Sequence, residues 1–265
     1  MPTILAEARG LSKDFPVKGK KGALLHGVSQ VDLPVYEGET LALVGESGCG
    51  KSTLGRLLLG LLPPTEGQVL FDGQDLAQCA PKELRALRRQ MQMVFQDTAA
   101  ALNPRWDVGE ILAEPLRIHK LCPPREFASR AEALLERVGL PRQLLGRYPH
   151  ELSGGQRQRV GIARALAVEP RLVVCDEPVS ALDVSVQAQM LNLLLDLQAD
   201  EGLTYVLVSH DLSVVRHSAG RVCVMFLGRV CEIGPTEEVF TAPRHPYTKL
   251  LLAAVPRPDP TQRNE

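Results

Sequence analysis

LALVGESGCGKST, residues 41–53, runs from a short apolar segment through a glycine-rich turn into a Lys-Ser-Thr end. It meets the pattern G-x-x-x-x-G-K-[ST] of a phosphate-binding loop between a strand and a helix. Glycines let backbone N–H groups turn toward phosphate oxygens, and the following helix presents the positive end of its dipole to the same anion. Lys51 is expected to reach the β- and γ-phosphates, and the Ser52 hydroxyl to bind Mg²⁺. The stretch therefore predicts binding of a nucleoside triphosphate.

Beyond this stretch, apolar strands alternate with helices. Strands are expected at 69–71, 91–95, 172–175 and 204–208, and helices at 51–62, 127–138, 157–168 and 185–199. Such alternation indicates a parallel sheet covered by helices on both faces. Residues 3–44 instead alternate short β-rich pieces with turn signals. Residues 108–139 are expected to form an inserted helical block, in two pieces separated by Pro123-Pro124.

The composition is that of one large or two small domains with an aliphatic core. The 265 residues are 45% hydrophobic but only 4% aromatic. The formal net charge of −1 gives no overall basic field for a nucleic-acid backbone. The first residues include no apolar run of signal-peptide length, and no stretch reaches the ~18 apolar residues of a membrane span. We therefore expect the protein to be made and kept in the cytosol.

Six cysteines are scattered without a C-x-x-C pair, a pattern typical of small buried thiols in a cytosolic protein. Cys49 differs because it lies inside the phosphate-binding stretch, beside a helix N-terminus that favours a thiolate. The sequence therefore predicts a lowered Cys49 pKa. It also predicts that thiol alkylation inhibits nucleotide hydrolysis and that ATP protects.

A second motif, LVVCDE at residues 172–177, places two acids directly after an apolar strand. Ligands of open α/β sheets bind at this carboxyl edge of the strands. Asp176 is expected to hold the hydration shell of Mg²⁺, and Glu177 to orient and deprotonate the attacking water. Two adjacent acids after a strand are individually common, so this motif alone does not decide for catalysis.

A third motif, LSGGQ at residues 152–156, directly precedes a helical run. Ser153 and Gln156 have the spacing of a capping box, so one interpretation is a well-capped helix start. The two glycines cost roughly 1 kcal/mol each relative to alanine in a helix, and a cap alone does not need them. They fit a phosphate that approaches the bare backbone at the positive end of the helix.

Nearly the whole chain resembles the ATP-binding subunit of ABC transporters. The resemblance is carried by the three motifs above together with Gln96 in VFQD, SALD at residues 180–183 and His210 in VSHD. The resemblance implies an α/β fold: a P-loop NTPase core with a mostly parallel sheet, an N-terminal antiparallel β subdomain and an inserted α-helical subdomain. It divides a single domain, 1–265, into a nucleotide-binding core (1–96 and 165–240), a helical subdomain (97–164) and a C-terminal tail (241–265).

The resemblance also implies a role for each site residue. Glu177 is the expected general base, His210 the contact to the γ-phosphate, and Gln96 the lid glutamine that touches Mg²⁺ or the water. The expected Mg²⁺ ligands are Ser52, Gln96 and Asp176. The expected ATP-binding residues are Phe15, Gly45, Glu46, Ser47, Gly48, Cys49, Gly50, Lys51, Ser52, Thr53, Ser153, Gly154, Gly155, Gln156 and Asp183.

Two of these residues have an ordinary structural alternative, and others are expected to act at an interface between two subunits. Phe15 is placed against adenine, although a small core phenylalanine is the alternative. A lone histidine such as His210 is otherwise an ordinary surface or core residue. The resemblance implies that the LSGGQ residues 153–156 close over ATP bound to a partner subunit and that Asp183 crosses the interface. ATP then bridges the two subunits of a head-to-tail dimer.

Two stretches, residues 92–116 and RHPYTKLLLAAVP at 244–256, resemble the peptide and nickel importers within this family. In that branch two different ATPase subunits pair beneath two transmembrane permease subunits, which are served by an extracytoplasmic substrate-binding protein. This implies a peripheral subunit at the cytoplasmic face of the inner membrane. Import of di- or oligopeptides is the first hypothesis, and import of nickel or a metal chelate is the second.

Three features of the sequence favour a transporter subunit over other ABC-type ATPases: its single cassette, its short insertion and its C-terminal stretch. A soluble ABC-type ATPase that acts on nucleic acid or the ribosome generally has a long coiled-coil insertion or two cassettes, whereas this chain has one cassette and a short insertion. No nucleic-acid partner is therefore expected. An exporter ATPase fits the C-terminal stretch less well. Some relatives hold an iron–sulfur centre near the C-terminus, but no cysteine follows Cys231, so none is expected here.

Overall fold

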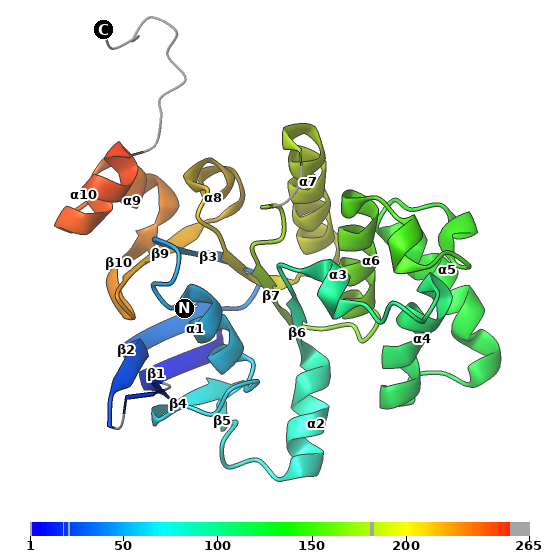
Figure 1. Ribbon diagram of the computed structural model, residues 1–265, viewed down its shortest axis with the longest axis horizontal. Helices are drawn as coiled ribbons and strands as arrows, with labels where there is room; N and C mark the ends of the chain where they lie inside the picture. Colours follow the sequence, from blue (N-terminus) through cyan, green and yellow to red (C-terminus); the bar gives the residue numbers. More distant parts are fainter. Residues whose placement is uncertain (1, 18, 21, 181–182, 255–265) are drawn as a thin grey trace, which may run out of the picture.

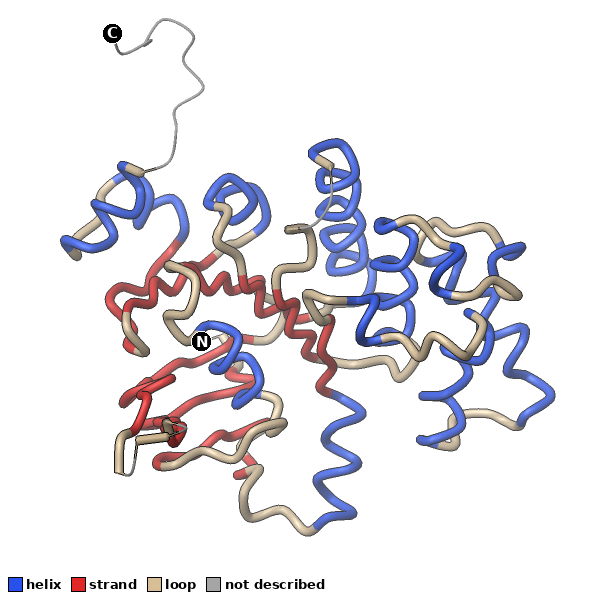
Figure 2. Tube along the Cα trace, in the orientation of Figure 1, coloured by secondary structure: helices blue, strands red, loops and turns tan. Residues whose placement is uncertain are grey.

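The computed structural model describes residues 2–17, 19–20, 22–180 and 183–254, which form two sheets with helices around them (Figures 1 and 2). The first sheet is antiparallel, in the strand order β2-β1-β4-β5. Its strands are β1 (Ile4–Pro16), β2 (Leu24–Tyr36), β4 (Glu66–Phe71) and β5 (Gln74–Asp75). The predicted antiparallel N-terminal subdomain is confirmed, and the short β-rich pieces expected there are two long paired strands.

The second sheet has the order β10-β9-β3-β8-β7-β6, and every pair is parallel except β10-β9. Its strands are β3 (Thr40–Val44), β6 (Met91–Val94), β7 (Leu172–Asp176), β8 (Thr204–Val208), β9 (Arg221–Phe226) and β10 (Arg229–Pro235). Leu41 and Leu43 of β3 join the apolar cluster shared with the antiparallel sheet, whereas Ala42 and Val44 join a cluster on the opposite face. Burial on both faces explains the continuous apolar runs of these strands.

Helix α1 (Lys51–Leu58) lies between the two sheets and buries leucines at helical spacing. It ends about one turn earlier than predicted. Gly60 has a φ of 60°, and the amides of Gly60 and Leu61 each donate a 2.9 Å hydrogen bond back into the last turn. This glycine turn ends the helix before Pro63-Pro64 is reached.

The inserted helices pack against the end of the second sheet that carries β6 and β7 (Figure 1). They are α3 (Thr98–Ala101), α4 (Val108–His119), α5 (Phe127–Arg137) and α6 (Gly154–Leu166), with the 3-10 turns η1 (Pro124–Glu126), η2 (Arg142–Leu144) and η3 (Pro149–Glu151). As predicted, Pro123-Pro124 separates the two main helical pieces, α4 and α5. One apolar cluster joins α4, α5 and α6 to Val173 of β7 and Leu207 of β8, so the insertion shares a core with the sheet.

The remaining helices are α2 (Pro81–Gln90), α7 (Val184–Glu201), α8 (Leu212–Ser218), α9 (Thr236–Thr241) and α10 (Pro246–Ala253). Figure 1 shows α9 and α10 beside β9 and β10, far from the inserted helices. Of the C-terminal tail expected at 241–265, residues 255–265 lie outside the described residues. Among the residues that are described, no helix has both the length and the apolar character needed to cross a membrane.

Candidate nucleotide-binding and hydrolysis site

The predicted phosphate-binding loop connects β3 to α1. Gly45 has a φ of 147° and Gly50 a φ of 108°. A Cβ atom at Gly45 would lie 2.2 Å from the Met225 carbonyl oxygen, and one at Gly50 would lie 2.1 Å from the Gly27 carbonyl oxygen. Only glycine fits at either position, so these two residues let the loop curl tightly against its neighbours.

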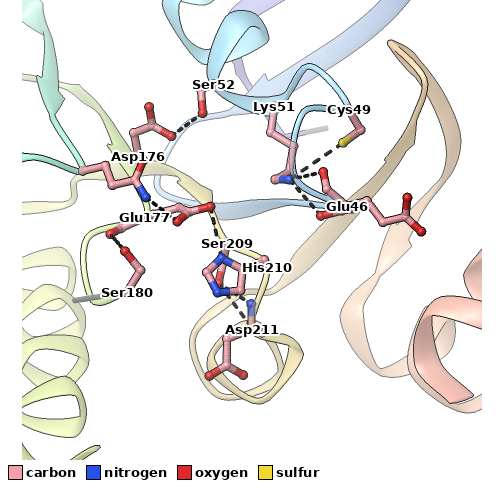
Figure 3. Close-up of polar contacts among 12 residues, drawn as sticks. Glu46, Cys49, Lys51, Ser52, Asp176, Glu177, Ser180, Ser209, His210 and Asp211 are labelled. Carbon is pink, nitrogen blue, oxygen red and sulfur yellow. Dashed lines mark hydrogen bonds and ion pairs between the residues drawn. The ribbon is translucent and has the colours of Figure 1, made fainter. Parts of the chain in front are cut away.

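Lys51, the first residue of α1, is buried within this loop. Its Nζ donates 2.8 Å hydrogen bonds to the carbonyl oxygens of Gly45 and Glu46, and the Cys49 Sγ lies 3.8 Å away (Figure 3). An ammonium group has three donors, which can be directed to other oxygens that come within reach. The loop therefore holds one positive charge where phosphate oxygens would meet the start of the helix.

A cavity of about 520 Å³ opens over the loop, which is within the size range of small-molecule sites. Its lining comprises Phe15, Leu25, His26, Gly27, Ser47, Gly48, Gly50, Lys51, Ser52, Thr53, Gln96, Glu177 and His210. The phosphate loop and all three predicted catalytic residues thus line the same cavity. Phe15 lies in the wall of the cavity together with Leu25, His26 and Gly27, which also belong to the antiparallel sheet. Of these four residues, only Phe15 was predicted to bind ATP.

Asp176 and Ser52 form a cluster of oxygen atoms at the edge of the loop. The Ser52 Oγ donates a 2.6 Å hydrogen bond to the Asp176 Oδ1, and Asp176 is only 2% exposed (Figure 3). Arg56, one helical turn beyond Ser52, places its Nη2 3.8 Å from the other carboxylate oxygen. Mg²⁺ prefers oxygen ligands and is commonly held by one or two carboxylates together with substrate phosphates. The donor set therefore fits Mg²⁺; the nearby arginine was not predicted.

Glu177 follows β7 in an uncommon backbone conformation for a non-glycine residue, with a φ of 47°. Its Oε2 accepts a 2.8 Å hydrogen bond from the Gln96 Nε2. Its Oε1 lies 3.1 Å from the His210 Nδ1 (Figure 3). Positive φ values at non-glycine residues are often found at functional sites, where the surroundings hold the backbone. Here the carboxylate is held between an amide and an imidazole at the cavity.

The sheet topology explains why these three side chains meet. Gln96 follows β6, Glu177 follows β7 and His210 follows β8, and these strands are parallel neighbours. Their carboxyl ends therefore lie along one edge of the sheet, where α/β proteins bind ligands. The next residue, Asp211, caps α8 by accepting hydrogen bonds from the amides of Ser213 and Val214. That cap fixes the loop that carries the histidine.

The prediction of a lowered Cys49 pKa is wrong. Burial raises the pKa of this thiol, and the opposing effect of the Lys51 charge and hydrogen bonds does not offset it. The side chain is only 5% exposed and joins the apolar cluster around α1. The helix N-terminus lies close to the residue, but the thiol is directed into the core. Only the backbone of Cys49 is therefore suited to contact a phosphate.

This burial predicts slow alkylation of Cys49. At pH 7 we expect N-ethylmaleimide to modify Cys49 more slowly than the half-buried Cys79 and Cys122, because both access and thiolate content are low. The rate at Cys49 should increase as the pH rises toward its raised pKa. Peptide mass spectrometry after timed labelling measures all three thiols in one sample. Modification of Cys49 ahead of the other two at pH 7 would contradict this expectation.

The LSGGQ motif forms the start of α6. Ser153 and Gln156 make a reciprocal capping box: the Gln156 amide donates to the Ser153 Oγ at 3.3 Å, and the Ser153 amide to the Gln156 Oε1 at 2.9 Å. A Cβ atom at Gly155 would lie 2.8 Å from the Val186 Cγ1. The packing of α6 against α7 therefore also favours glycine here, and the sequence alone does not reveal this contact.

Neither the LSGGQ residues nor Asp183 line the cavity over Lys51. Asp183 is an exposed residue at the N-cap of α7. Its neighbours in SALD, Ala181 and Leu182, lie outside the described residues. Within one chain, then, the structure brings together the phosphate loop, Asp176, Glu177, Gln96, His210 and Phe15, and leaves residues 153–156 and Asp183 outside that cavity.

Comparison with known proteins agrees with this arrangement. The family described as "ABC transporter" matches residues 28–180, and "Oligopeptide/dipeptide transporter, C-terminal region" matches residues 231–265. The oligopeptide transport ATP-binding protein OppF of Escherichia coli (strain K12) is 51% identical over 97% of this chain and 79% of that protein. OppF of Haemophilus influenzae is 48% identical over 99% of this chain and 81% of that protein.

A solved structure shows the same architecture. The dimeric post-hydrolysis state of the ATP-binding cassette MJ0796, bound to ADP and Pi, matches with a TM-score of 0.78 and 31% identity, over 87% of this chain and 98% of that chain. Its fold and its sequence are thus both similar to those described here. The chain belongs to the ABC transporter family, as an ATP-binding ATPase subunit that carries the C-terminal region of the oligopeptide/dipeptide transporters.

Proposed function

We propose that this chain hydrolyses MgATP to drive peptide import through a membrane complex. The observation that carries the proposal is the Glu177 carboxylate, held by Gln96 and His210 in the cavity that also contains Lys51. Such a constellation can bind a triphosphate at one end and deprotonate a water at the other. The relatives named for oligopeptide transport, and the matching C-terminal region, support peptides as the cargo.

The loop and α1 bind the phosphates in this proposal. Lys51 exchanges its bonds to the Gly45 and Glu46 carbonyls for phosphate oxygens, and the amides at the start of α1 donate to the same anion. The Ser52 hydroxyl and Asp176 hold Mg²⁺, with Gln96 at the same edge of the sheet. Bound there, Mg²⁺ neutralises the charge that develops on the phosphates. Phe15, in the cavity wall, is the proposed contact to adenine.

Glu177 is the proposed general base. One carboxylate oxygen takes the proton of the attacking water, while the Gln96 amide and the His210 ring keep the carboxylate in place. His210 is 57% exposed at its side chain, so it can also reach toward a γ-phosphate. Both neighbours come from loops that follow parallel strands. A shift of either loop would therefore disturb the base.

The LSGGQ residues 153–156 and Asp183 act, we propose, across a head-to-tail dimer. They lie outside the chain's own cavity, and the N-terminus of α6 carries a capped, glycine-containing first turn able to accept an anion. The dimeric form of the similar cassette MJ0796 supports this arrangement. The partner is proposed to be a second, non-identical ATPase subunit.

A groove beside Gln96 is the proposed contact to the two transmembrane permease subunits. It has a volume of about 280 Å³ and lies between β6 and the inserted helices, with apolar side chains such as Met93, Phe95 and Ile118 in its lining. Ile118 is 46% exposed and Leu61, also in the groove, is 44% exposed. Because Phe95 precedes Gln96, a partner seated there acts directly on the loop that holds Glu177. We propose accordingly that the chain is a peripheral subunit at the cytoplasmic face of the inner membrane, with no nucleic-acid partner.

Peptides and nickel can be distinguished as cargo with the assembled transporter. We expect ATP hydrolysis by the reconstituted complex, with its extracytoplasmic substrate-binding protein, to rise when di- or oligopeptides are added and to stay at the basal rate with Ni²⁺ or a metal chelate. Phosphate release measures both. Stimulation by nickel and not by peptides would reject peptide import and favour the metal alternative.

A further inference from the structure

The C-terminal region and the phosphate loop are in direct contact. Helix α10 begins at Pro246, and Tyr247 in its first turn contacts the loop after β3. The Glu46 amide donates a 3.2 Å hydrogen bond to the Tyr247 hydroxyl, which joins residues 201 positions apart. The segment of the chain that matches the oligopeptide/dipeptide transporter region therefore touches the loop that binds phosphate.

The hydrogen bond involves a peptide unit that Lys51 also uses, because the Glu46 amide shares its peptide bond with the Gly45 carbonyl, which accepts from the Lys51 Nζ at 2.8 Å. The Glu46 carbonyl accepts from the Lys51 Nζ at 2.8 Å and from the Cys49 amide at 3.2 Å, both within the loop. The Glu46 amide instead points outward to Tyr247. When the Lys51 ammonium turns to a phosphate, Glu46 is still held by the Cys49 amide within the loop and by the Tyr247 hydroxyl outside it.

Tyr247 is itself fixed by the sheet. Its ring packs on Phe226 with the ring centroids 4.4 Å apart and an interplanar angle of 34°. Phe226 is the last residue of β9, and the residue before it, Met225, has the carbonyl oxygen that excludes a Cβ at Gly45. The end of β9 therefore meets the loop at Gly45 directly and at Glu46 through Tyr247.

The backbone that carries Tyr247 is anchored to β10. The two carboxylate oxygens of Glu232 accept hydrogen bonds from the amides of Arg244 at 2.8 Å and His245 at 3.0 Å. His245 then caps α10, since its Nδ1 accepts from the Tyr247 amide at 3.1 Å. Pro246 stands at the first helical position, where its fixed φ suits a helix start. Residues 244–247 are thus held in one conformation before any ligand arrives.

We propose that Tyr247 is a positioning residue for the phosphate-binding loop, through the hydrogen bond between its hydroxyl and the Glu46 amide. The inference rests on the proposed function, because it assigns the loop to ATP. Tyr247 is not one of the residues that line the cavity. It holds the outer side of the loop, so its loss allows the loop more conformations and lowers the fraction that can bind phosphate.

The test compares Tyr247→Phe with the parent chain, because phenylalanine keeps the ring on Phe226 and removes only the hydroxyl. We expect the Kd for a fluorescent ATP analogue to rise about three- to tenfold, as for the loss of one hydrogen bond. The KM for ATP of the assembled transporter should rise alike, with kcat at saturating ATP nearly unchanged. The melting temperature should stay close to that of the parent. The matched control is Tyr36→Phe, since the Tyr36 ring lies against Arg221. This variant should bind the ATP analogue as the parent chain does.

Glu232→Ala provides a second, independent variant. It frees the backbone of Arg244 and His245, so it should weaken analogue binding at least as much as Tyr247→Phe. The double variant should bind no more weakly than Glu232→Ala alone, because both changes remove the same contact with Glu46. Additive losses would show that Glu232 does not act through Tyr247 and would overturn the proposed anchoring.

The same titrations separate the role of Tyr247 from ATP binding itself. If the parent chain binds the analogue and Tyr247→Phe binds it equally well, the positioning role is overturned and the ATP site stands. If the parent shows no saturable binding, both are overturned. A rise in Kd shared by Tyr247→Phe and Tyr36→Phe would also reject the specific role of Tyr247.

Discussion

Glu177→Gln is expected to reduce ATP turnover by about 10²- to 10⁴-fold, the usual contribution of a general base. Glutamine keeps the size of the side chain and its hydrogen-bonding ability toward Gln96 and His210, but it cannot take a proton from water. ATP binding should therefore persist while hydrolysis stops, and the chain should accumulate as an ATP-bound closed dimer with its partner. Phosphate release at saturating MgATP measures the turnover, and size-exclusion chromatography detects the dimer.

The matched control is Glu169→Gln. This glutamate has a side chain that is 70% exposed and lies 3.9 Å from Arg89, away from the cavity. Its substitution should leave turnover within twofold of the parent, about the scale of an exposed ion pair. Hydrolysis by Glu177→Gln at the parental rate would remove the general-base assignment. It would also leave the convergence of Gln96 and His210 on this carboxylate without a catalytic purpose.

Lys51→Ala is expected to weaken ATP binding by about one to two orders of magnitude, because a hydrogen bond to a charged group contributes roughly 1.5–3 kcal/mol. The ammonium is the only charged donor that the loop itself holds at the start of α1 among the described residues. Equilibrium titration with the fluorescent ATP analogue measures the loss. The exposed Lys82 of α2 offers the matched control, and Lys82→Ala should bind ATP as the parent does.

A thermal melt belongs with this experiment. Lys51 is buried, and its removal leaves two carbonyl oxygens with fewer donors, so some loss of stability is expected. The binding result is interpreted at a temperature where the variant is folded. Parental affinity in folded Lys51→Ala would show that the loop backbone and Mg²⁺ suffice, and that the lysine is not the phosphate contact.

The central part of the site could be predicted because its residues follow local patterns. Gln96, Glu177 and His210 each lie within two residues of the end of a mostly apolar segment, and such segments form parallel strands whose carboxyl ends align. The phosphate loop is likewise encoded in consecutive residues, since glycines and a helix start suffice to shape it. The antiparallel and helical parts followed from the family resemblance together with turn and proline signals.

Features that depend on tertiary contacts could not be predicted in this way. The Cys49 thiol is buried because its side chain is directed toward the core around α1, which the helix N-terminus next to it does not reveal. The packing reason for Gly155 depends on Val186 of another helix. The contact between Tyr247 and Glu46 spans 201 positions, and no local pattern indicates it. The end of α1 is different, because Gly60 is a local signal that ends the helix ahead of the predicted boundary at residue 62.

Recovery of the chain with its partners from native membranes tests the proposed import function directly. An N-terminal tag and gentle extraction should recover two multi-span proteins and a second, non-identical ATPase subunit, which mass spectrometry identifies. A control extraction from untagged cells sets the background. Recovery of the tagged chain with ribosomes or nucleic acid, and without membrane proteins, would contradict the proposal that it powers an importer.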